Sequence, residues 1–275
     1  MKRILLSALA FLTFTACVSA GAPAGEPTWA EPQSVHNQAL KADGIKKIEI
    51  NLKNEVLNIS LSENENITIE VLSNHQMGNP LVVVDSKSIK IEQKEKTNKL
   101  ERRTCTVNIT IPKKNNIQTM KIQNEDALSS ISDIKADNFS FESDAGAVAV
   151  NNAEIAKGAE ISTSNADIQV KKLSCTELKV SSSKGNINIS DAEARNFAVS
   201  SDKGSLDLDF PKMFEKESSV SIGSGTAKIA LPSSADFWTS GDVGSGRFRS
   251  EFAQDSKGPK FKFKVGGGDM RLLKR

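Results

Sequence analysis

Hydrophobic and polar residues alternate along most of the chain from Ile45 onward. Ile48 and Ile50 alternate with charged neighbours, and the same pattern returns from Ile67 to Val71. A period of two places successive side chains on opposite faces of a β-strand, so each such segment predicts a strand with one buried face. No window shows a convincing helical period. The chain is therefore expected to be all-β, with one sizeable core.

A short turn followed by an alternating strand recurs at regular intervals in the second half of the chain. The last residues of the matching tetrapeptides are Leu128, Val148, Ile168, Ile187, Leu206, Ala227, Phe248 and Met270. This regular spacing is typical of stacked repeat proteins, in which each unit buries its apolar face only against its neighbours. Glycine at several turns, such as Gly185 and Gly204, supplies the positive φ that a sharp corner needs.

Each repeat also contains a second strand before the turn. The inward-facing pairs of this strand are Phe139 and Phe141, Ala159 and Ile161, Leu178 and Val180, Phe197 and Val199, Val220 and Ile222, and Phe261 and Phe263. Outward positions carry small polar residues, among them Thr163 and Ser200, which are expected to face solvent. The repeat predicts a parallel stack with rungs of about 20 residues, each adding about 4.8 Å. An antiparallel β-sandwich is the alternative, because it uses the same alternation.

The N-terminus is typical of an exported bacterial protein. Lys2 and Arg3 precede an apolar run that is too short to span a bilayer, and a small-residue cleavage site follows, so residues 1–20 are predicted to be a signal peptide. The segment Phe14-Thr15-Ala16-Cys17 also fits a lipobox, in which case residues 1–16 are removed and Cys17 carries the lipid anchor. Residues 21–43 are interpreted as a flexible tether, and residues 44–275 as one β-solenoid domain. Trp29 and Leu40 are candidates for docking on that domain as a cap.

The charge balance argues against two classes of partner. The chain has 36 basic and 34 acidic residues, and removal of the signal peptide takes away two bases and no acid, which leaves 34 of each. A nucleic-acid-binding protein usually has a basic excess, so no nucleic-acid partner is expected. Contact with a membrane is expected only through the N-terminal lipid.

The two cysteines of the repeat region are expected to be free thiols. Cys105 and Cys175 lie about three and a half rungs apart, which is roughly 17 Å along the axis. A disulfide needs Cα atoms within about 7 Å. Two cysteines at this spacing are not a metal signature either.

The repeat region resembles the bacterial putative-adhesin family, which comprises exported repetitive β proteins of largely unknown function. The resemblance covers roughly residues 44 to 275. It is carried by LVVVD at 81–85, SIKI at 88–91, TVNITIP at 106–112, residues 117–122, and the Gly/Ser turns described above. Several turns here have alanine where the family mostly has glycine, as at Ala166. The resemblance implies a right-handed parallel β-solenoid, a single-stranded β-helix, and no catalytic residues.

Catalytic chemistry finds little support in the sequence. The two histidines, His36 and His75, lie far from any nucleophile motif and are expected to be solvated. A carbohydrate-active enzyme on a β-helix would need acids that project into one groove from adjacent rungs, and only Asp144, Asp167 and Asp202 qualify. No catalytic, cofactor-binding or metal-binding residue is therefore predicted.

These observations favour a non-enzymatic, adhesin-like interaction scaffold of the cell envelope. We expect an outer-membrane or periplasmic lipoprotein, or alternatively a secreted protein, whose partner is a protein or glycan of the envelope or cell surface. Two alternatives stay open. One is a carbohydrate-active enzyme on the same scaffold, and the other is an envelope assembly or stress accessory protein. The irregular segments 76–80 and 94–103 are the places where a binding loop could be inserted.

Overall fold

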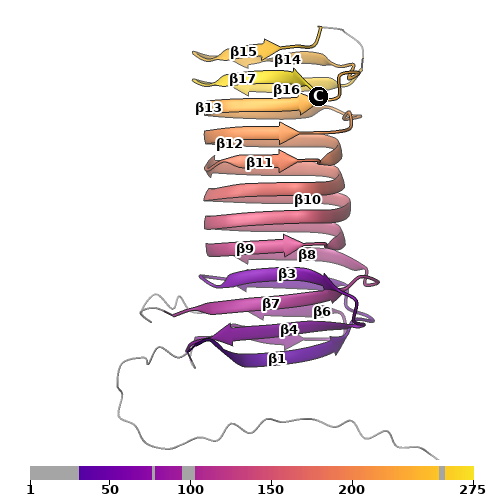
Figure 1. Ribbon diagram of the computed structural model, residues 1–275, viewed down its shortest axis with the longest axis vertical. Coiled ribbons are helices and arrows are strands. Elements are labelled where there is room, and N and C mark those ends of the chain that lie inside the picture. The colour runs from indigo at the N-terminus through magenta and orange to yellow at the C-terminus, as the bar shows by residue number, and fades with distance from the viewer. Residues whose placement is uncertain (1–30, 76–77, 95–102, 254–257) are drawn as a thin grey trace, which may run out of the picture.

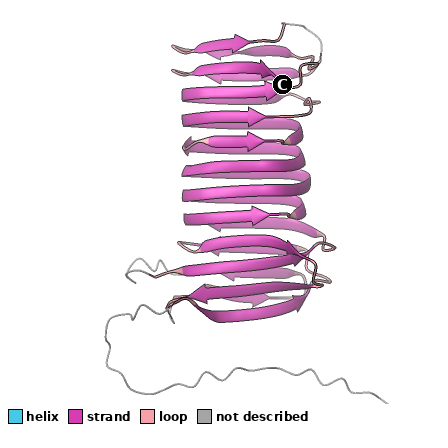
Figure 2. Cartoon of the chain, viewed as in Figure 1, coloured by secondary structure: helices cyan, strands magenta, loops and turns pink. Residues whose placement is uncertain are grey.

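The computed structural model describes residues 31–75, 78–94, 103–253 and 258–275, and these contain strands and loops but no helix (Figure 2). No described segment could therefore cross a membrane as a helix. The strands are β1 (Gln33–Lys41), β2 (Lys47–Leu52), β3 (Val56–Ser62), β4 (Asn66–Ser73), β5 (Leu81–Val84), β6 (Ser88–Glu92), β7 (Cys105–Pro112), β8 (Ile117–Asn124), β9 (Asp126–Ser132), β10 (Lys135–Lys184), β11 (Ile187–Ser190), β12 (Glu193–Asp209), β13 (Ser218–Leu231), β14 (Trp238–Val243), β15 (Arg247–Ser250), β16 (Lys260–Val265) and β17 (Asp269–Lys274).

The strands stack as two flattened columns that face each other across the core (Figure 1). Column A contains β5, β6, β2, β8, the first halves of the coils in β10, β12 and β13, and then β16 and β14. Column B contains β1, β4, β7, β3, β9, the second halves of those coils, β11, β17 and β15. One strand of each column, joined by a corner, forms a rung.

Nearly all neighbouring strands in the stack are parallel. Phe139 is the register partner of Met120, Ile168 of Ile187, and Leu206 of Ala227, so register partners are separated by one repeat of the sequence. Antiparallel pairing is confined to one end, where β4 pairs with β1 and β7, and β5 pairs with β6. The alternative of an antiparallel β-sandwich is therefore wrong for the body of the molecule, which is all-β and mostly parallel.

The chain does not stack its rungs in sequence order at the N-terminal end. The β2–β3 rung contacts β6–β7 on one side and β8–β9 on the other. The β6–β7 rung is thus placed between β2–β3 and the antiparallel strands β4 and β5. The chain turns back once before it coils toward the C-terminus.

A second inversion closes the C-terminal end. β16 and β17 pair with β13, and β14 and β15 pair with the outer side of β16 and β17 (Figure 1). The inner position belongs to the more apolar rung, since Phe261, Met270 and Leu272 are fully buried. The β14–β15 rung contains Asp242 and Arg249, both exposed, and provides a polar end surface of the kind that a solenoid needs.

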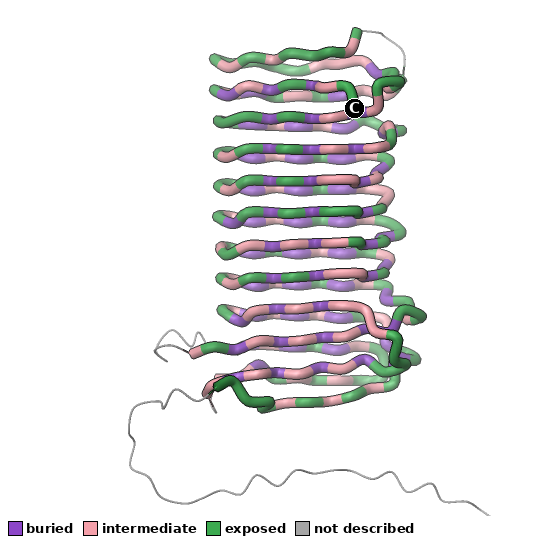
Figure 3. Tube along the Cα trace, viewed as in Figure 1, coloured by how far each residue is buried: buried purple, intermediate pink, exposed green. Residues whose placement is uncertain are grey.

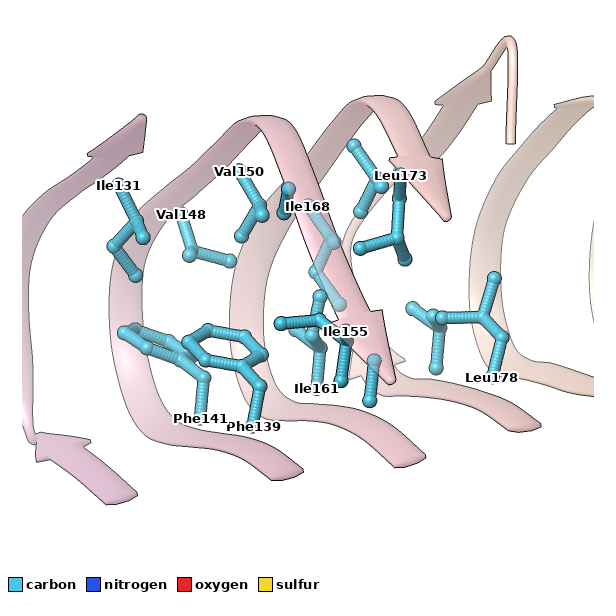
Figure 4. Packing of buried hydrophobic residues seen from close by; sticks show 14 of the residues in the cluster. Ile131, Phe139, Phe141, Val148, Val150, Ile155, Ile161, Ile168, Leu173 and Leu178 are labelled. Carbon is cyan, nitrogen blue, oxygen red and sulfur yellow. The ribbon is translucent and has the colours of Figure 1, made fainter. Parts of the chain in front are cut away.

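Apolar side chains from both columns meet in one continuous core. The inward pairs predicted from the alternation are buried, except that Phe263 is half-buried. Figure 3 shows this alternation of buried and less buried positions along the central coils. In the central rungs Phe139 and Phe141 of column A lie opposite Val148 and Val150 of column B (Figure 4). Since burial of such a side chain contributes roughly 1.5–3 kcal/mol, the stack is held together mainly by this core.

Small hydroxyl residues fill the inside of the first corner, which is where the chain passes from column A to column B within one rung. Thr163 and Ser182 are both buried, and their hydroxyl oxygens are 3.1 Å apart on neighbouring rungs. The Thr163 hydroxyl also donates to the carbonyl oxygen of Ala166 at 3.1 Å. The prediction that Thr163 faces outward is therefore wrong. The strict alternation is interrupted at the corner, where the chain turns and an inward hydroxyl satisfies a backbone carbonyl.

At the opposite corner, where the chain passes from column B to the next rung of column A, residues other than glycine adopt a positive φ. Asp133, Asn152, Lys172 and Asp191 have φ between 51° and 57°, and they occupy the same place in successive coils. Asn and Asp tolerate this left-handed conformation because their short side chains can form local hydrogen bonds. Here the amide nitrogen of Asn152 donates to the carboxylate of Asp133 on the neighbouring rung at 2.5 Å.

Part of the segment assigned to the tether is a strand. β1 pairs antiparallel with β4, so the ordered domain begins before residue 44. β1 alternates only between half-buried and exposed positions and has no fully buried side chain. It is held mainly by backbone pairing to the edge of β4. Leu40 packs against the core, in line with its expected role as a cap. Trp29 and the signal-peptide boundary lie outside the described residues.

Aromatic rings fill the core near the C-terminal end. Phe197 stacks on Phe210 with ring centroids 4.1 Å apart, and the edge of Phe214 meets Phe197 at 5.6 Å. Phe237 connects this cluster to Phe261 at 6.0 Å. Phe214 and Phe237 come from the loops before β13 and β14, so the rings anchor both of these longer connections to the solenoid.

The corner between β2 and β3 contains a buried ion pair instead of a glycine. Glu55 is fully buried, and one of its carboxylate oxygens accepts a hydrogen bond from the Arg103 guanidinium at 2.7 Å. The other oxygen accepts the backbone N–H groups of Lys53 and Asn54. Arg103 also donates to the carbonyl oxygen of Gly78 at 2.7 Å. The pair therefore ties the irregular segments around residues 78 and 103 to the first rungs.

Cys105 and Cys175 lie five rungs apart, which is about 24 Å along the axis. The intervening rungs are β2–β3, β8–β9 and the first two coils of β10. The count of three and a half rungs from the sequence is too small, because the β6–β7 rung lies on the far side of β2–β3. Both cysteines are free thiols in this structure.

We expect neither thiol to react with a maleimide at pH 8 in the folded protein, and both to react in denaturant. Burial raises the pKa of the Cys105 thiol to about 11 and that of Cys175 to about 12, and the thiolate is the reactive form. Because both folded-state pKa values exceed the unfolded value of about 8.5, their contribution to stability is present below that pH and is lost as pH rises toward 11. Rapid native labelling of either cysteine at pH 8 would contradict this environment.

Candidate interaction surface

One line of outward-facing residues runs along column B from end to end. Strand register places these residues on successive rungs in the order Asn37, Glu70, Asn108, Asn58, Ser130, Ala149, Gln169, Asn188, Asp207, Lys228, Arg271 and Arg249. We call this set the outer line. Parallel in-register stacking produces it, because equivalent positions of neighbouring rungs lie about 4.8 Å apart. The line presents amides and small residues in its middle and cations at its C-terminal end.

The middle of the outer line is hollowed into a shallow groove of about 490 Å³. Ala147 and Ala149 form its floor, since their methyl groups leave space between larger residues on the neighbouring rungs. Leu128 borders the floor on one side and Gln169 on the other. Leu128 is 60% exposed, the largest exposure among the large hydrophobic residues that the structure describes. The groove thus combines a small apolar surface with amide groups.

Amide side chains extend the polar surface along the rungs. The amide nitrogen of Asn58 donates to the side-chain oxygen of Asn108 at 3.0 Å, and Asn108 donates to Glu70 at 3.3 Å. On the other side of the groove, Asn188 follows Gln169 in register. Amides supply both donors and acceptors, which suits the hydroxyl groups of a glycan or the backbone of a peptide.

The three candidate acids do not meet in one active-site groove. Asp144 and Asp202 are exposed near the first corner, but three rungs, about 14 Å, separate them. This exceeds the roughly 5–9.5 Å between the two carboxyl groups of a glycosidase. Asp167 lies on column B and accepts the backbone N–H of Asn186, on the next rung, at 2.7 Å. Asn186 in turn accepts the N–H of Ser205 at 3.1 Å, so Asp167 belongs to a hydrogen-bonded corner ladder.

Other residues singled out in the sequence have structural surroundings or lie outside the described residues. His36 is half-buried in β1, with Nε2 shielded from solvent, rather than in a solvated tether. Cys17, the predicted lipid anchor, and residues 76–77 and 95–102 of the irregular segments lie outside the described part of the chain. In the described ranges, no cluster of His, Cys, Asp and Glu is arranged to hold a metal ion.

Sequence reasoning missed the cationic end of the outer line. Lys228, Arg249 and Arg271 occupy the same outward position in three repeats, and the insertion of β17 between β13 and β15 places Arg271 in the middle. A sequential stack would have placed Arg249 next to Lys228 and put Arg271 outermost. The polarity of residues 238–250 is the signal that could have indicated this order, because a rung with few apolar residues suits the end of a stack.

The geometry defines an all-β protein of stacked, mostly parallel coils, a β-solenoid-like repeat architecture. The family model described as Toastrack DUF4097 matches residues 45–267, and the chain belongs to this family. The resemblance to the bacterial putative-adhesin family is thereby confirmed.

Solved structures of low sequence identity are similar to this chain. A putative adhesin from Bacteroides fragilis is 12% identical, with 90% of this chain and 99% of that chain covered and a TM-score of 0.53. A putative adhesin from Parabacteroides merdae is 16% identical, with coverage of 87% and 96% and a TM-score of 0.47. A putative cell adhesion protein from Clostridium sporogenes is 14% identical, with coverage of 89% and 100% and a TM-score of 0.34. A comparison with curated protein sequences found no match.

Proposed function

We propose that this protein is a non-enzymatic interaction scaffold of the bacterial cell envelope, whose contact surface is the outer line on column B. The observation that carries the proposal is the continuous, in-register outer line with its shallow amide-lined groove. The scaffold that we propose for this surface is a right-handed coil in which each rung holds one sequence repeat. Its partner is a glycan or protein of the envelope or cell surface.

Three observations support an adhesin-like role. The described residues provide a long rigid surface rather than an enclosed pocket, and the groove is open and shallow. The candidate acids take part in corner structure or lie too far apart for paired catalysis. The similar structure from Bacteroides fragilis is called a putative adhesin, although its low identity extends the likeness only to the fold.

We further propose that the protein is exported and anchored through a lipid on Cys17. The support is the sequence of residues 1–20, in which an apolar run leads to a small-residue cleavage site and a lipobox. Mass spectrometry of the N-terminus from native membranes tests the anchor. An acylated Cys17 is expected, whereas a free N-terminus at Gly21 would establish a secreted protein.

Filling the groove tests the contact surface. We expect Ala149→Trp to weaken retention of the purified protein on bacterial envelope polysaccharide by about tenfold or more, because the indole would occupy the groove floor. Ala198→Trp is the matched control, since Ala198 is an outward alanine on column A. Equal weakening by both substitutions, or by neither, would remove the groove from the contact surface.

A further inference from the structure

The C-terminal end of the outer line is a ladder of cations on adjacent rungs. Lys228 is the register partner of Arg271, and Arg271 is the register partner of Arg249. Arg247 lies two residues from Arg249 on the same outward face of β15. All four side chains are exposed. We call Lys228, Arg271, Arg249 and Arg247 the cationic ladder.

The cationic ladder is not neutralised by ion pairs. Throughout the described ranges, each ion pair within 4.0 Å involves other residues, although Asp207 and Asp269 are register neighbours of the ladder. Two lysines of the same end on column A differ in this respect. Lys262 pairs with Glu217 at 2.5 Å, and Lys260 lies over the Trp238 ring at 4.6 Å.

Stacked like charges cost stability in a sheet. Like charges directly opposite each other on neighbouring strands are destabilising, and here Arg271 has a cation on both sides. Local violations of folding rules without structural compensation are typical of functional sites. An anionic partner that bridges the three rungs would relieve the repulsion and form charge-assisted hydrogen bonds with the guanidinium groups.

We infer that the cationic ladder binds a linear acidic polysaccharide that lies along the outer line across successive rungs. This inference rests on the proposed function and specifies the class of its partner. Carboxylate, sulfate or phosphate groups of the polysaccharide contact the ladder, while its hydroxyl groups continue toward the amides of Asn188 and Gln169. The amides and cations thus lie on one column face, with Asp207 between Asn188 and Lys228.

The place of the ladder in the fold favours a glycan over a lipid surface. β1, where the described chain begins, lies at one end of the solenoid, and the ladder lies at the other (Figure 1). In a protein anchored at its N-terminus, the ladder is therefore at the end of the solenoid opposite the strand that comes first after the anchor. The ladder also lies on a flat column face that continues into the amides, which matches a linear polymer.

The test compares binding of polygalacturonate, neutral dextran and phosphatidylglycerol vesicles to the purified protein without its lipid, residues 21–275, by calorimetry. We expect polygalacturonate alone to bind, with affinity falling about tenfold or more between 50 and 500 mM salt, as screening predicts for contacts with a polyanion. Arg271→Gln should weaken binding by about tenfold or more. Lys264→Gln is the control, because Lys264 lies on the same rung and is exposed on column A.

Each other outcome separates the inference from the proposed function. Equal binding by Arg271→Gln and the unchanged protein would overturn the assignment of the ladder as the binding site and leave the scaffold role intact. Binding of vesicles instead of polygalacturonate would overturn the glycan as partner. Shortening of polygalacturonate during the titration would overturn the non-enzymatic function itself. Thermal unfolding of Arg271→Gln at or above the original temperature is expected and excludes misfolding as the cause of lost binding.

Discussion

Replacement of Gly204 by alanine is expected to destabilise the protein by about 3–5 kcal/mol, because strain at its φ and overpacking each cost roughly 1–3 kcal/mol. Gly204 has φ of 146°, and a Cβ atom there would lie 2.1 Å from the carbonyl oxygen of Gly185 on the neighbouring rung. That oxygen belongs to the backbone of a stacked coil and has little freedom to move.

Gly158→Ala is the matched control for this prediction. A Cβ atom at Gly158 would meet nothing within 4 Å, so its effect should stay within about 0.5 kcal/mol. Urea unfolding followed by circular dichroism measures both variants. Similar stability for Gly204→Ala and Gly158→Ala would mean that the coils are not packed as closely at the corner as the structure has them.

Replacement of Phe197 by alanine is expected to cost about 3–5 kcal/mol, the usual range for loss of a buried aromatic ring. The ring is 2% exposed and contacts Phe210, Phe214 and Phe261, so its removal opens a cavity and breaks three ring contacts. The loss should also loosen residues 211–217, because Phe214 packs edge-on against the missing ring.

Phe252→Ala provides the comparison for the aromatic cluster. Phe252 is half-buried and contacts Phe237 with centroids 5.1 Å apart, so its loss should cost about 1 kcal/mol. Hydrogen exchange measures the local effect: protection should fall at β12 and β13 in Phe197→Ala but stay unchanged there in Phe252→Ala. A uniform small effect of both substitutions would contradict an aromatic anchor for the two loops.

The alternation and the regular repeat period were sufficient to predict an all-β parallel stack. Inward pairs such as Leu178 and Val180 are fully buried because side-chain direction in a strand is a local property. The structure also explains why alanine stands at some turns where glycine was expected. Ala127 and Ala166 lie at the first corner, and neither has a positive φ. Glycine is needed at corners where φ is positive, as at Gly146 and Gly185, and where a neighbouring carbonyl leaves no room for a Cβ atom, as at Gly246.

The order of rungs could not be predicted in the same way. Any rung can pair with any other, since the backbone hydrogen bonds of parallel strands carry no sequence information. The inversion at the C-terminal end follows from a comparison of whole rungs, in which the apolar β16–β17 rung is buried and the polar β14–β15 rung covers it. That inversion sets the order of the cations in the ladder, with Arg271 in the middle. The pairing of Glu55 with Arg103 joins residues 48 positions apart. Neither was visible as a local motif.

β1 and the first corner illustrate a second limit of the pattern. β1 is stabilised by backbone pairing to β4 rather than by buried apolar side chains, so its sequence is that of a loop. At the corner, inward positions are filled by Thr163 and Ser182, whose hydroxyl groups both donate to the carbonyl oxygen of Ala166. A polar residue therefore predicts an outward side chain only where the strand is regular.

The central claim is that the protein binds an envelope glycan along column B and leaves it chemically unchanged. Purified protein and bacterial envelope polysaccharide can be mixed and followed by size-exclusion chromatography with light scattering, over hours and at several protein concentrations. The account predicts saturable co-elution, loss of co-elution with Ala149→Trp, and a constant polysaccharide mass after the protein is removed. Progressive shortening of the polysaccharide, or co-elution that Ala149→Trp leaves unchanged, would contradict it.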